Sequence, residues 1–177
     1  MKFFAVAGSP VLHSKSPLIF KHFFNKFSVE AAYGRVAANS AGEIIFIFNS
    51  FGFDGMNITT PFKNEIIPCL SELDEVASAT GSVNTIIRWE NGAKGFNTDP
   101  LGVVRALESR NIQPQGKKCA VIGAGGAGAS AAFGLIQKGA EVTIVNRTVE
   151  KARKLAASLG CQSAEPDFWA DIIKDAE

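Results

Sequence analysis

The chain has 177 residues, of which 46% are hydrophobic and 20% are charged, and its formal net charge is +1. This composition is that of an ordinary soluble globular protein, and a charge so close to zero gives no reason to expect a nucleic-acid or membrane partner. The length allows one large or two small domains. No apolar run reaches the roughly 18 residues that a membrane-spanning helix needs.

The cysteines point to a reducing compartment. Cys69, Cys119 and Cys161 are odd in number and lack the spacing of a disulfide framework or a zinc site, so we expect free thiols and no metal. The N-terminus lacks the basic, apolar and small-residue regions of a signal peptide. A cytoplasmic location is therefore expected, or a plastid one if the source is a plant and a transit peptide was removed.

The first half of the chain alternates apolar strands with amphipathic helices. The expected strands are residues 3–7, 29–36 and 53–59, and the expected helices are residues 16–27, 41–51 and one that begins at Pro61. This order predicts a mainly parallel sheet covered by helices. A short helix over residues 73–80, a strand over 83–89, a turn at Asn91-Gly92 and a return strand over 93–96 follow.

Two serines lie before the first expected helix. Ser16 is followed by Pro17, which fits a hydroxyl N-cap and a proline at the first helical position. Ser14 lies two residues earlier. The residues leave two interpretations open: capping and loop solvation, or an anion site in which two hydroxyls hold a carboxylate beside a helix N-terminus.

The segment from Asn57 to Lys63 leaves the third strand. Thr60 fits an N-cap and Pro61 the first helical position, which would place Lys63 in the first turn. The positive end of the helix dipole would then favour the neutral amine and lower the pKa of Lys63, as acid–base chemistry requires. The plain alternative is a solvated lysine at a turn.

A domain boundary is expected near residue 100. Asp99 precedes Pro100, so Asp99 fits the N-cap of a helix that runs to about Arg110 and connects the two halves. Asn84, early in its strand, is unremarkable by itself.

The second half opens with an apolar strand over residues 117–122 that runs into a glycine-rich turn. Gly123, Gly125 and Gly128 satisfy G-x-G-x-x-G, and a helix to about Lys138 follows. A strand before and a helix after give this pattern its weight as a dinucleotide site, in which glycines allow close approach of a pyrophosphate. The alternative is a glycine turn used only for packing.

The next strand, residues 141–145, ends at Asn146-Arg147-Thr148. An NAD site would show an acidic residue here, whereas Arg147 and Lys151 bring two cations to one helix N-terminus, which suits a phosphate. We therefore expect NADP; the alternative is two solvated cations on a surface turn. Thr148 fits the N-cap of a helix to Leu159, and strands are expected at residues 162–164 and 170–173.

Six segments together resemble shikimate dehydrogenases, over residue 1 to about residue 160. They are Gly8-Ser9-Pro10 with His13-Ser14-Lys15-Ser16-Pro17, Asn57-Ile58-Thr59-Thr60-Pro61-Phe62-Lys63, Gly81-Ser82-Val83-Asn84-Thr85, Asn97-Thr98-Asp99, Gly123-Ala124-Gly125-Gly126-Ala127 and Asn146-Arg147-Thr148. The resemblance implies an α/β protein with a substrate-binding catalytic domain over residues 1–100. A Rossmann-type NADP-binding domain over residues 101–177 would follow, apparently truncated.

The implied activity is that of an oxidoreductase: the NADP-dependent, reversible reduction of 3-dehydroshikimate to shikimate, in aromatic amino acid and chorismate biosynthesis. The alternatives are a quinate/shikimate dehydrogenase and a substrate- and nucleotide-binding fragment without turnover. The expected partners are small molecules, and the expected state is a monomer or homodimer.

The resemblance also assigns roles to residues. Ser14 and Ser16 would hold the substrate carboxylate; Thr59, Lys63, Asn84 and Asp99 would hold its hydroxyl and keto groups, with Lys63 and Asp99 as the acid–base pair. Gly125, Gly126 and Ala127 would meet the pyrophosphate, and Asn146, Arg147 and Thr148 would meet the adenosine 2′-phosphate. Gly123 and Ala124 of the same turn, and Lys151 on account of its charge, complete the expected cofactor site.

Overall fold

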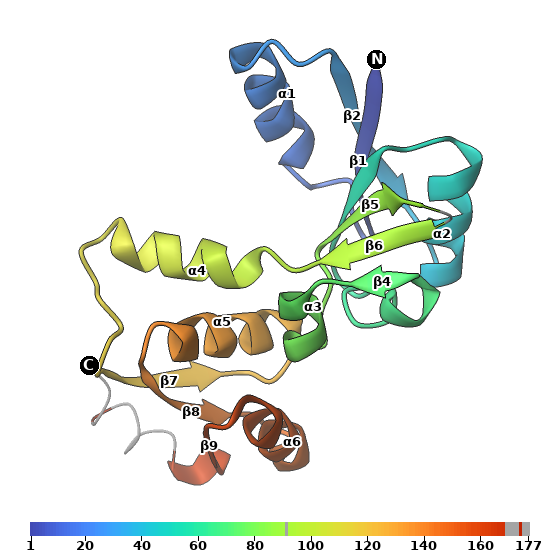
Figure 1. The fold of residues 1–177 in the computed structure, drawn as a ribbon. Helices are drawn as coiled ribbons and strands as arrows, with labels where there is room; N and C mark the ends of the chain where they lie inside the picture. Colours follow the sequence, from blue (N-terminus) through green and yellow to red (C-terminus); the bar gives the residue numbers. More distant parts are fainter. Residues whose placement is uncertain (91, 169–173, 175–177) are drawn as a thin grey trace. The chain divides into compact units, whose positions relative to one another are not determined.

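The computed structural model describes residues 1–90, 92–168 and 174, and the chain divides into two compact units (Figure 1). Unit 1 consists of Met1–Ala77 and Val83–Phe96, and unit 2 of Ser78–Ser82 and Asn97–Glu177. The chain therefore enters unit 2 briefly, returns to unit 1, and leaves it again after Phe96.

Unit 1 is built on a mixed sheet. Its elements are β1 (Lys2–Gly8), α1 (Ser16–Lys26), β2 (Ala31–Ala37), α2 (Ala41–Ser50), β3 (Gly55–Ile58), the 3-10 turn η1 (Ile67–Cys69), β4 (Glu72–Leu73), β5 (Thr85–Trp89) and β6 (Gly92–Phe96), while α3 (Glu75–Thr80) is shared between the units. The strand order is β2-β1-β3-β5-β6-β4. Three of the five pairings are parallel and two, β3–β5 and β5–β6, are antiparallel, so the expected α/β class with a mainly parallel sheet is confirmed.

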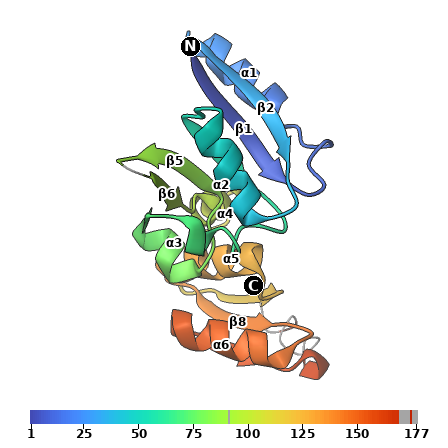
Figure 2. The same cartoon turned by 90° about the vertical axis from the view of Figure 1, so that its right-hand side faces the viewer.

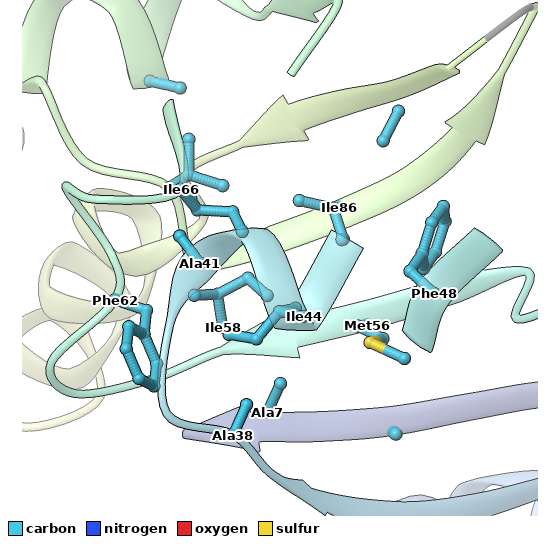
Figure 3. Packing of buried hydrophobic residues seen from close by; sticks show 14 residues of the cluster. Ala7, Ala38, Ala41, Ile44, Phe48, Met56, Ile58, Phe62, Ile66 and Ile86 are labelled. Carbon is cyan, nitrogen blue, oxygen red and sulfur yellow. The ribbon is translucent and has the colours of Figure 1, made fainter. Parts of the chain in front are cut away.

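Two helices cover opposite faces of β1. Ala5 and Ala7 belong to the core cluster that α2 completes with Ile44 and Phe48 (Figure 3). Phe4 points to the other face, because side chains alternate along a strand, and its ring lies 5.8 Å from that of a phenylalanine of α1. Figure 2 shows α2 in front of β1 and α1 behind it. Ile44 and Phe48 are fully buried, and each contributes roughly 1.5–3 kcal/mol through burial.

The expected N-cap at Ser16 is wrong by one residue. The N-cap of α1 is Lys15, and Ser16 is the first helical residue. The N–H of Ser16 donates to Oγ of Ser14 at 3.3 Å, so the earlier serine supplies the hydroxyl that the helix start requires. Both serines are therefore tied to the beginning of α1.

The helix expected from Pro61 is also wrong, because residues 60–66 form turns. The carbonyl of Thr60 accepts from the N–H of Ser9 at 3.1 Å, and the carbonyl of Lys63 accepts from the N–H of Val83 at 2.8 Å. Carbonyls that a helix would use for its own bonds are thus bonded to distant segments of unit 1. The Thr60–Pro61 peptide is cis. Because residues 60–66 form no helix, no helix dipole from this segment acts on Lys63.

The hairpin is confirmed with its loop one residue earlier than expected. Trp89 pairs with Gly92, so Gly92 belongs to the return strand and not to the turn. Glu90 follows Trp89 with a φ of 42°, and Asn91 lies outside the described residues. The two-residue strand β4, which pairs with β6, had no sequence signal.

Unit 2 repeats a strand–helix pattern. Its elements are α4 (Asp99–Glu108), β7 (Lys118–Ile122), α5 (Gly126–Gln137), β8 (Glu141–Val145), α6 (Val149–Leu159), β9 (Gln162–Ala164) and the 3-10 turn η2 (Pro166–Phe168). The strands form a parallel sheet in the order β7-β8-β9. Its core is made of small and branched side chains from the sheet, α5 and α6: Val121, Ala132, Leu135, Val142, Ile144, Ala152 and Ala156.

The helix starts in unit 2 follow the sequence with one exception. Thr148 is the N-cap of α6, as expected, but the N-cap of α4 is Thr98 rather than Asp99. Asp99 becomes the first helical residue because its N–H donates to Oδ1 of Asn97 at 3.1 Å. The strand expected over residues 170–173 lies outside the described residues. Within the part of the chain that is described, no helix is long and apolar enough to cross a membrane.

Candidate functional site

The hydroxyls of Ser14 and Ser16 lie side by side in unit 1. Oγ of Ser14 donates to Oγ of Ser16 at 3.1 Å, and both residues are half-buried. The main-chain carbonyl of Ser14 accepts two hydrogen bonds from Arg35, at 3.0 Å from Nε and 2.6 Å from Nη2. A hydroxyl pair with a guanidinium beside it is an arrangement that suits an anion.

Tyr33 of β2 connects the serines to the sheet. Its hydroxyl donates to Oδ1 of Asn57 at 2.5 Å, and its ring stacks on Phe20 of α1 with centroids 4.3 Å apart. Burial raises the pKa of Tyr33 far above that of a free phenol, and a hydrogen bond with the Ser16 side chain opposes this with a smaller effect. Because the phenol keeps its proton, it acts as a donor to Asn57 while it contacts Ser16.

The same network continues to Asn84. Nδ2 of Asn57 donates to Oγ1 of Thr85 at 3.1 Å, and Oγ1 of Thr85 donates to Oδ1 of Asn84 at 2.9 Å. Hydrogen-bonded side chains therefore run without a break from Ser14 to Asn84. This network brings together three residues, Ser14, Ser16 and Asn84, for which the family resemblance implies a substrate-binding role.

Three members of the network were not assigned any role from the sequence. Asn57 lies inside a segment used for the family resemblance, and Thr85 ends another, but their side-chain partners come from different strands. Tyr33 is the single tyrosine of the chain and lies in a strand of small residues, which is the one signal that could have singled it out.

Thr59 lies where β3 turns toward Lys63. Its N–H donates to the carbonyl of Ala7 at 2.9 Å, and a Cβ added to Gly8 would lie 2.4 Å from Cγ2 of Thr59. Glycine at position 8 is thus required for Thr59 to approach the end of β1. Lys63 is half-buried in the turn that follows.

Asp99 is carried by unit 2, whereas Lys63 is carried by unit 1. Neither unit alone holds the acid–base pair expected from the sequence.

The glycine-rich turn of unit 2 depends on two of its glycines. Gly123 has a φ of +115°, in the region that favours glycine. A Cβ at Gly128 would lie only 1.9 Å from the carbonyl oxygen of Gly123. The absence of a side chain at Gly128 thus permits the close strand–helix contact of a dinucleotide turn. Helix α5 begins directly after this turn, at Gly126.

Asn146 fastens this turn to the next one. Its Oδ1 accepts from the N–H of Ala124 at 3.1 Å, and its Nδ2 donates to the carbonyl of Thr148 at 2.9 Å. The side chain of Asn146 therefore spans the two turns at the carboxyl ends of β7 and β8. This gives Asn146 a structural task in addition to any ligand contact.

Two exposed cations lie near the N-terminus of α6. Arg147 precedes the N-cap and Lys151 lies in the first turns, where the helix dipole disfavours positive charge. Glu150 lies in the same turn and pairs with Arg153 at 3.0 Å. An anion bound beside Arg147 and Lys151 would offset the repulsion.

Cysteine chemistry adds nothing to these sites. All three cysteines are described, and none of them forms a disulfide; burial raises the pKa of Cys161. Among residues 1–90, 92–168 and 174, no group of three or more His, Cys, Asp or Glu side chains could hold a metal ion.

Comparison with known proteins identifies the family. The model described as the shikimate dehydrogenase substrate binding domain matches residues 6–86, and the model described as shikimate / quinate 5-dehydrogenase matches residues 105–173. A protein of Pyrococcus abyssi named shikimate dehydrogenase (NADP(+)) is 35% identical over 181 residues, which cover 99% of this chain and 68% of the relative. The chain belongs to the shikimate dehydrogenase family.

Other shikimate dehydrogenases extend the comparison. The protein of the same name from Lysinibacillus sphaericus is 40% identical over 164 residues, which cover 90% of this chain and 59% of the relative. The Aquifex aeolicus structure superposes with a TM-score of 0.92 at 32% identity, covering 99% of this chain and 66% of that one. The Thermus thermophilus structure, in complex with NADP(H) and shikimate, has a TM-score of 0.84 at 34% identity, covering 93% of this chain and 63% of that one.

This chain therefore spans 59% and 55% of the length of two curated relatives that it matches.

Proposed function

We propose that this chain belongs to an NADP-dependent shikimate dehydrogenase, which interconverts 3-dehydroshikimate and shikimate in chorismate biosynthesis. The observation that carries the proposal is the match of two family models, one for the substrate-binding domain and one for the dehydrogenase, to successive parts of the chain. Relatives at 35–40% identity are named shikimate dehydrogenase (NADP(+)).

The substrate site proposed in unit 1 would recognise a hydroxylated carboxylate. Ser14 and Ser16 would donate their hydroxyl protons to the carboxylate, and the guanidinium of Arg35, bonded to the Ser14 carbonyl, supports this with positive charge. Thr59 and Asn84 would hold the ring hydroxyls. The hydrogen bonds from Ser16 through Tyr33, Asn57 and Thr85 would keep the two ends of the site at a fixed separation.

Lys63 and Asp99 are proposed as the acid–base pair. NADP, when bound, supplies or accepts the hydride at carbon. Lys63 would hold or release the proton at the substrate oxygen, and Asp99 would orient the same hydroxyl and complete the pair. The half-buried position of Lys63 limits the water that competes for that proton.

The residues of unit 2 fit a dinucleotide. The positive φ of Gly123 and the missing Cβ at Gly128 support a pyrophosphate turn that includes Ala124, Gly125, Gly126 and Ala127. Asn146, Arg147, Thr148 and Lys151 would surround the 2′-phosphate. Arg147 stands where an NAD site would carry an acidic residue, which is why NADP is proposed.

A second candidate substrate is quinate, since the family model for residues 105–173 is described as shikimate / quinate 5-dehydrogenase. NADPH or NADH formation, followed with shikimate or quinate and with NADP or NAD, tests these alternatives together. We expect turnover with shikimate and NADP, and none when NAD replaces NADP. Turnover of quinate at a comparable rate would broaden the assignment, and binding of both ligands without turnover would identify the chain as a binding fragment.

We propose residues 1–100 and 101–177 as the functional domains, with the brief entry of residues 78–82 into unit 2 as a refinement. Three cysteines that form no disulfide support the proposed reducing, cytoplasmic location. A monomer or homodimer is expected, and light scattering after size-exclusion chromatography would distinguish them.

A further inference from the structure

The buried side chain of Asn97 joins three segments of unit 2. Nδ2 donates to Oγ1 of Thr80 and to Oγ of Ser130, each at 2.9 Å, and Oδ1 accepts from the N–H of Asp99 at 3.1 Å. Three of the four hydrogen-bonding positions of this amide are thus occupied. Asn97 and Thr80 are 4% exposed and Ser130 is 0% exposed, so water does not replace these bonds.

The direction of the hydrogen bonds fixes the amide. Oγ of Ser130 donates to the carbonyl of Gly126 at 2.8 Å, and Oγ1 of Thr80 donates to the carbonyl of Ser82 at 3.5 Å. Because both hydroxyl protons are engaged, the two oxygens accept from Nδ2 of Asn97. Oδ1 is therefore the atom left to accept from the N–H of Asp99. In a flipped amide, Oδ1 would face the hydroxyl oxygens of Thr80 and Ser130, so three acceptors would meet with no proton between them.

A second contact holds Asp99 from the other side. Gly126, Ser130 and Gly134 are four residues apart along α5, so they share one face. A Cβ at Gly134 would lie 2.8 Å from the carbonyl oxygen of Pro100, so α4 begins in backbone contact with that face. Asn97, two residues before Asp99, and Pro100, directly after it, are thus both in contact with α5, the helix that follows the glycine-rich turn.

We propose that Asn97 is a positioning residue, which holds the main chain of Asp99 and the glycine-rich turn before α5 as one rigid piece. The importance of this for catalysis rests on the proposed function, in which Asp99 meets the substrate and the turn meets NADP. The group that orients the substrate oxygen would then be held in register with the dinucleotide by unit 2 itself. A displacement of about 1 Å at such a group can cost about 10²-fold in rate.

The hydrogen bonds through which Asn97 holds Asp99 to α5, here called the tether, are tested by amide hydrogen exchange, measured by NMR on the 177-residue chain. In Asn97→Ala, the amide of Asp99 should exchange about tenfold faster, because it loses a buried acceptor, while amides within β8 keep their protection. Ser130→Ala is a milder variant that should give a smaller acceleration if Asn97→Ala fails to fold. Ser158→Ala is the matched control, since its exposed hydroxyl bonds a carbonyl of its own helix, α6, at 2.8 Å.

Titration with NADP+ provides a readout that a purely structural residue would not change. In the native chain, NADP+ should shift the amide resonances of both the glycine-rich turn and Asp99; in Asn97→Ala, the shift at the turn should persist and that at Asp99 should be lost. In turnover assays, kcat should fall about 10²-fold with little change in the KM for NADP+.

Unchanged exchange at Asp99 in both variants, or an unchanged response to NADP+ in Asn97→Ala, would overturn the proposal. If NADP+ shifts no resonance of the native glycine-rich turn, the proposed function fails instead, and amide exchange still decides whether Asn97 is the tether.

Discussion

The hydroxyl of Tyr33 donates to Oδ1 of Asn57 across 2.5 Å, and this contact joins β2 to β3 across β1, the strand that lies between them. The residues are 24 positions apart in the chain. Through this bond, the two serines and Asn84 belong to one network. A substitution at Tyr33 should therefore affect the hydrogen bonding of both the serine pair and Asn84.

Tyr33→Phe should weaken shikimate binding about two- to tenfold, because one hydrogen bond to Asn57 and one to Ser16 are lost while the ring stacking on Phe20 is kept. Isothermal titration calorimetry would measure the affinity. Ser71→Ala is the control, since its hydroxyl bonds the Ala93 carbonyl outside the network. Affinities equal to that of the native chain in both variants would show that the network does not support the site.

Alkaline pH should act through the same phenol. Burial raises the pKa of Tyr33 above the ordinary tyrosine value of 10.0, so the unfolded chain loses this proton first as pH rises. The stabilisation is therefore complete below pH 10.0 and is lost progressively above it as pH approaches the folded pKa. Because Tyr33 is the single tyrosine, phenolate absorbance reports it alone. Half-ionisation at pH 10.0 in the folded chain would contradict the burial argument.

Gly128→Ala should destabilise unit 2 by about 1–3 kcal/mol or more, because the new Cβ would overlap the carbonyl oxygen of Gly123. Gly102→Ala is the matched control: its Cβ would have no described atom within 4 Å, and alanine inside α4 should stabilise the helix by about 0.5–1 kcal/mol. Urea unfolding would measure both. Equal effects of the two substitutions would mean that the turn can relax.

Lys63→Ala should lower kcat by roughly 10²–10⁴ with less change in KM, as expected for the loss of general acid–base help. Lys21→Ala, an exposed lysine of α1, is the control. Steady-state kinetics of NADPH formation decide the point, and a loss confined to KM would make Lys63 a binding residue only.

Arg147→Ala should reduce the affinity for NADP about 10- to 100-fold and leave that for NAD nearly unchanged, because a charge-assisted bond to a phosphate is removed. Arg110→Ala, another exposed arginine of unit 2, provides the comparison. Fluorescence titration with both dinucleotides measures the difference. Equal weakening toward both would argue against a contact with the 2′-phosphate.

Local patterns predicted the elements well where the deciding contacts are local. The G-x-G-x-x-G turn and the N-cap at Thr148 depend on residues within a few positions, and both appear as expected. The helix at Pro61 failed because the Thr60 and Lys63 carbonyls bond to Ser9 and Val83. No local pattern contains that information.

The same limit applies to the candidate site. Serines and glycines could be chosen from short segments, but the network through Tyr33 and the buried amide of Asn97 join residues 17 to 33 positions apart. Side chains that meet across such separations become visible when the sheet register and helix packing are known.

The path of the chain between the units has a practical consequence for dividing the protein. The chain passes from one unit to the other after Ala77, after Ser82 and after Phe96. A single cut after residue 96 would therefore leave residues 78–82, which belong to unit 2, in the fragment that contains unit 1. The first fragment would keep Thr80 without Asn97, and the second would keep Asn97 with one of its two hydroxyl acceptors gone. Each piece would then expose polar groups that the intact chain buries. Proteolysis between the units should therefore yield fragments less stable than their sheets alone suggest.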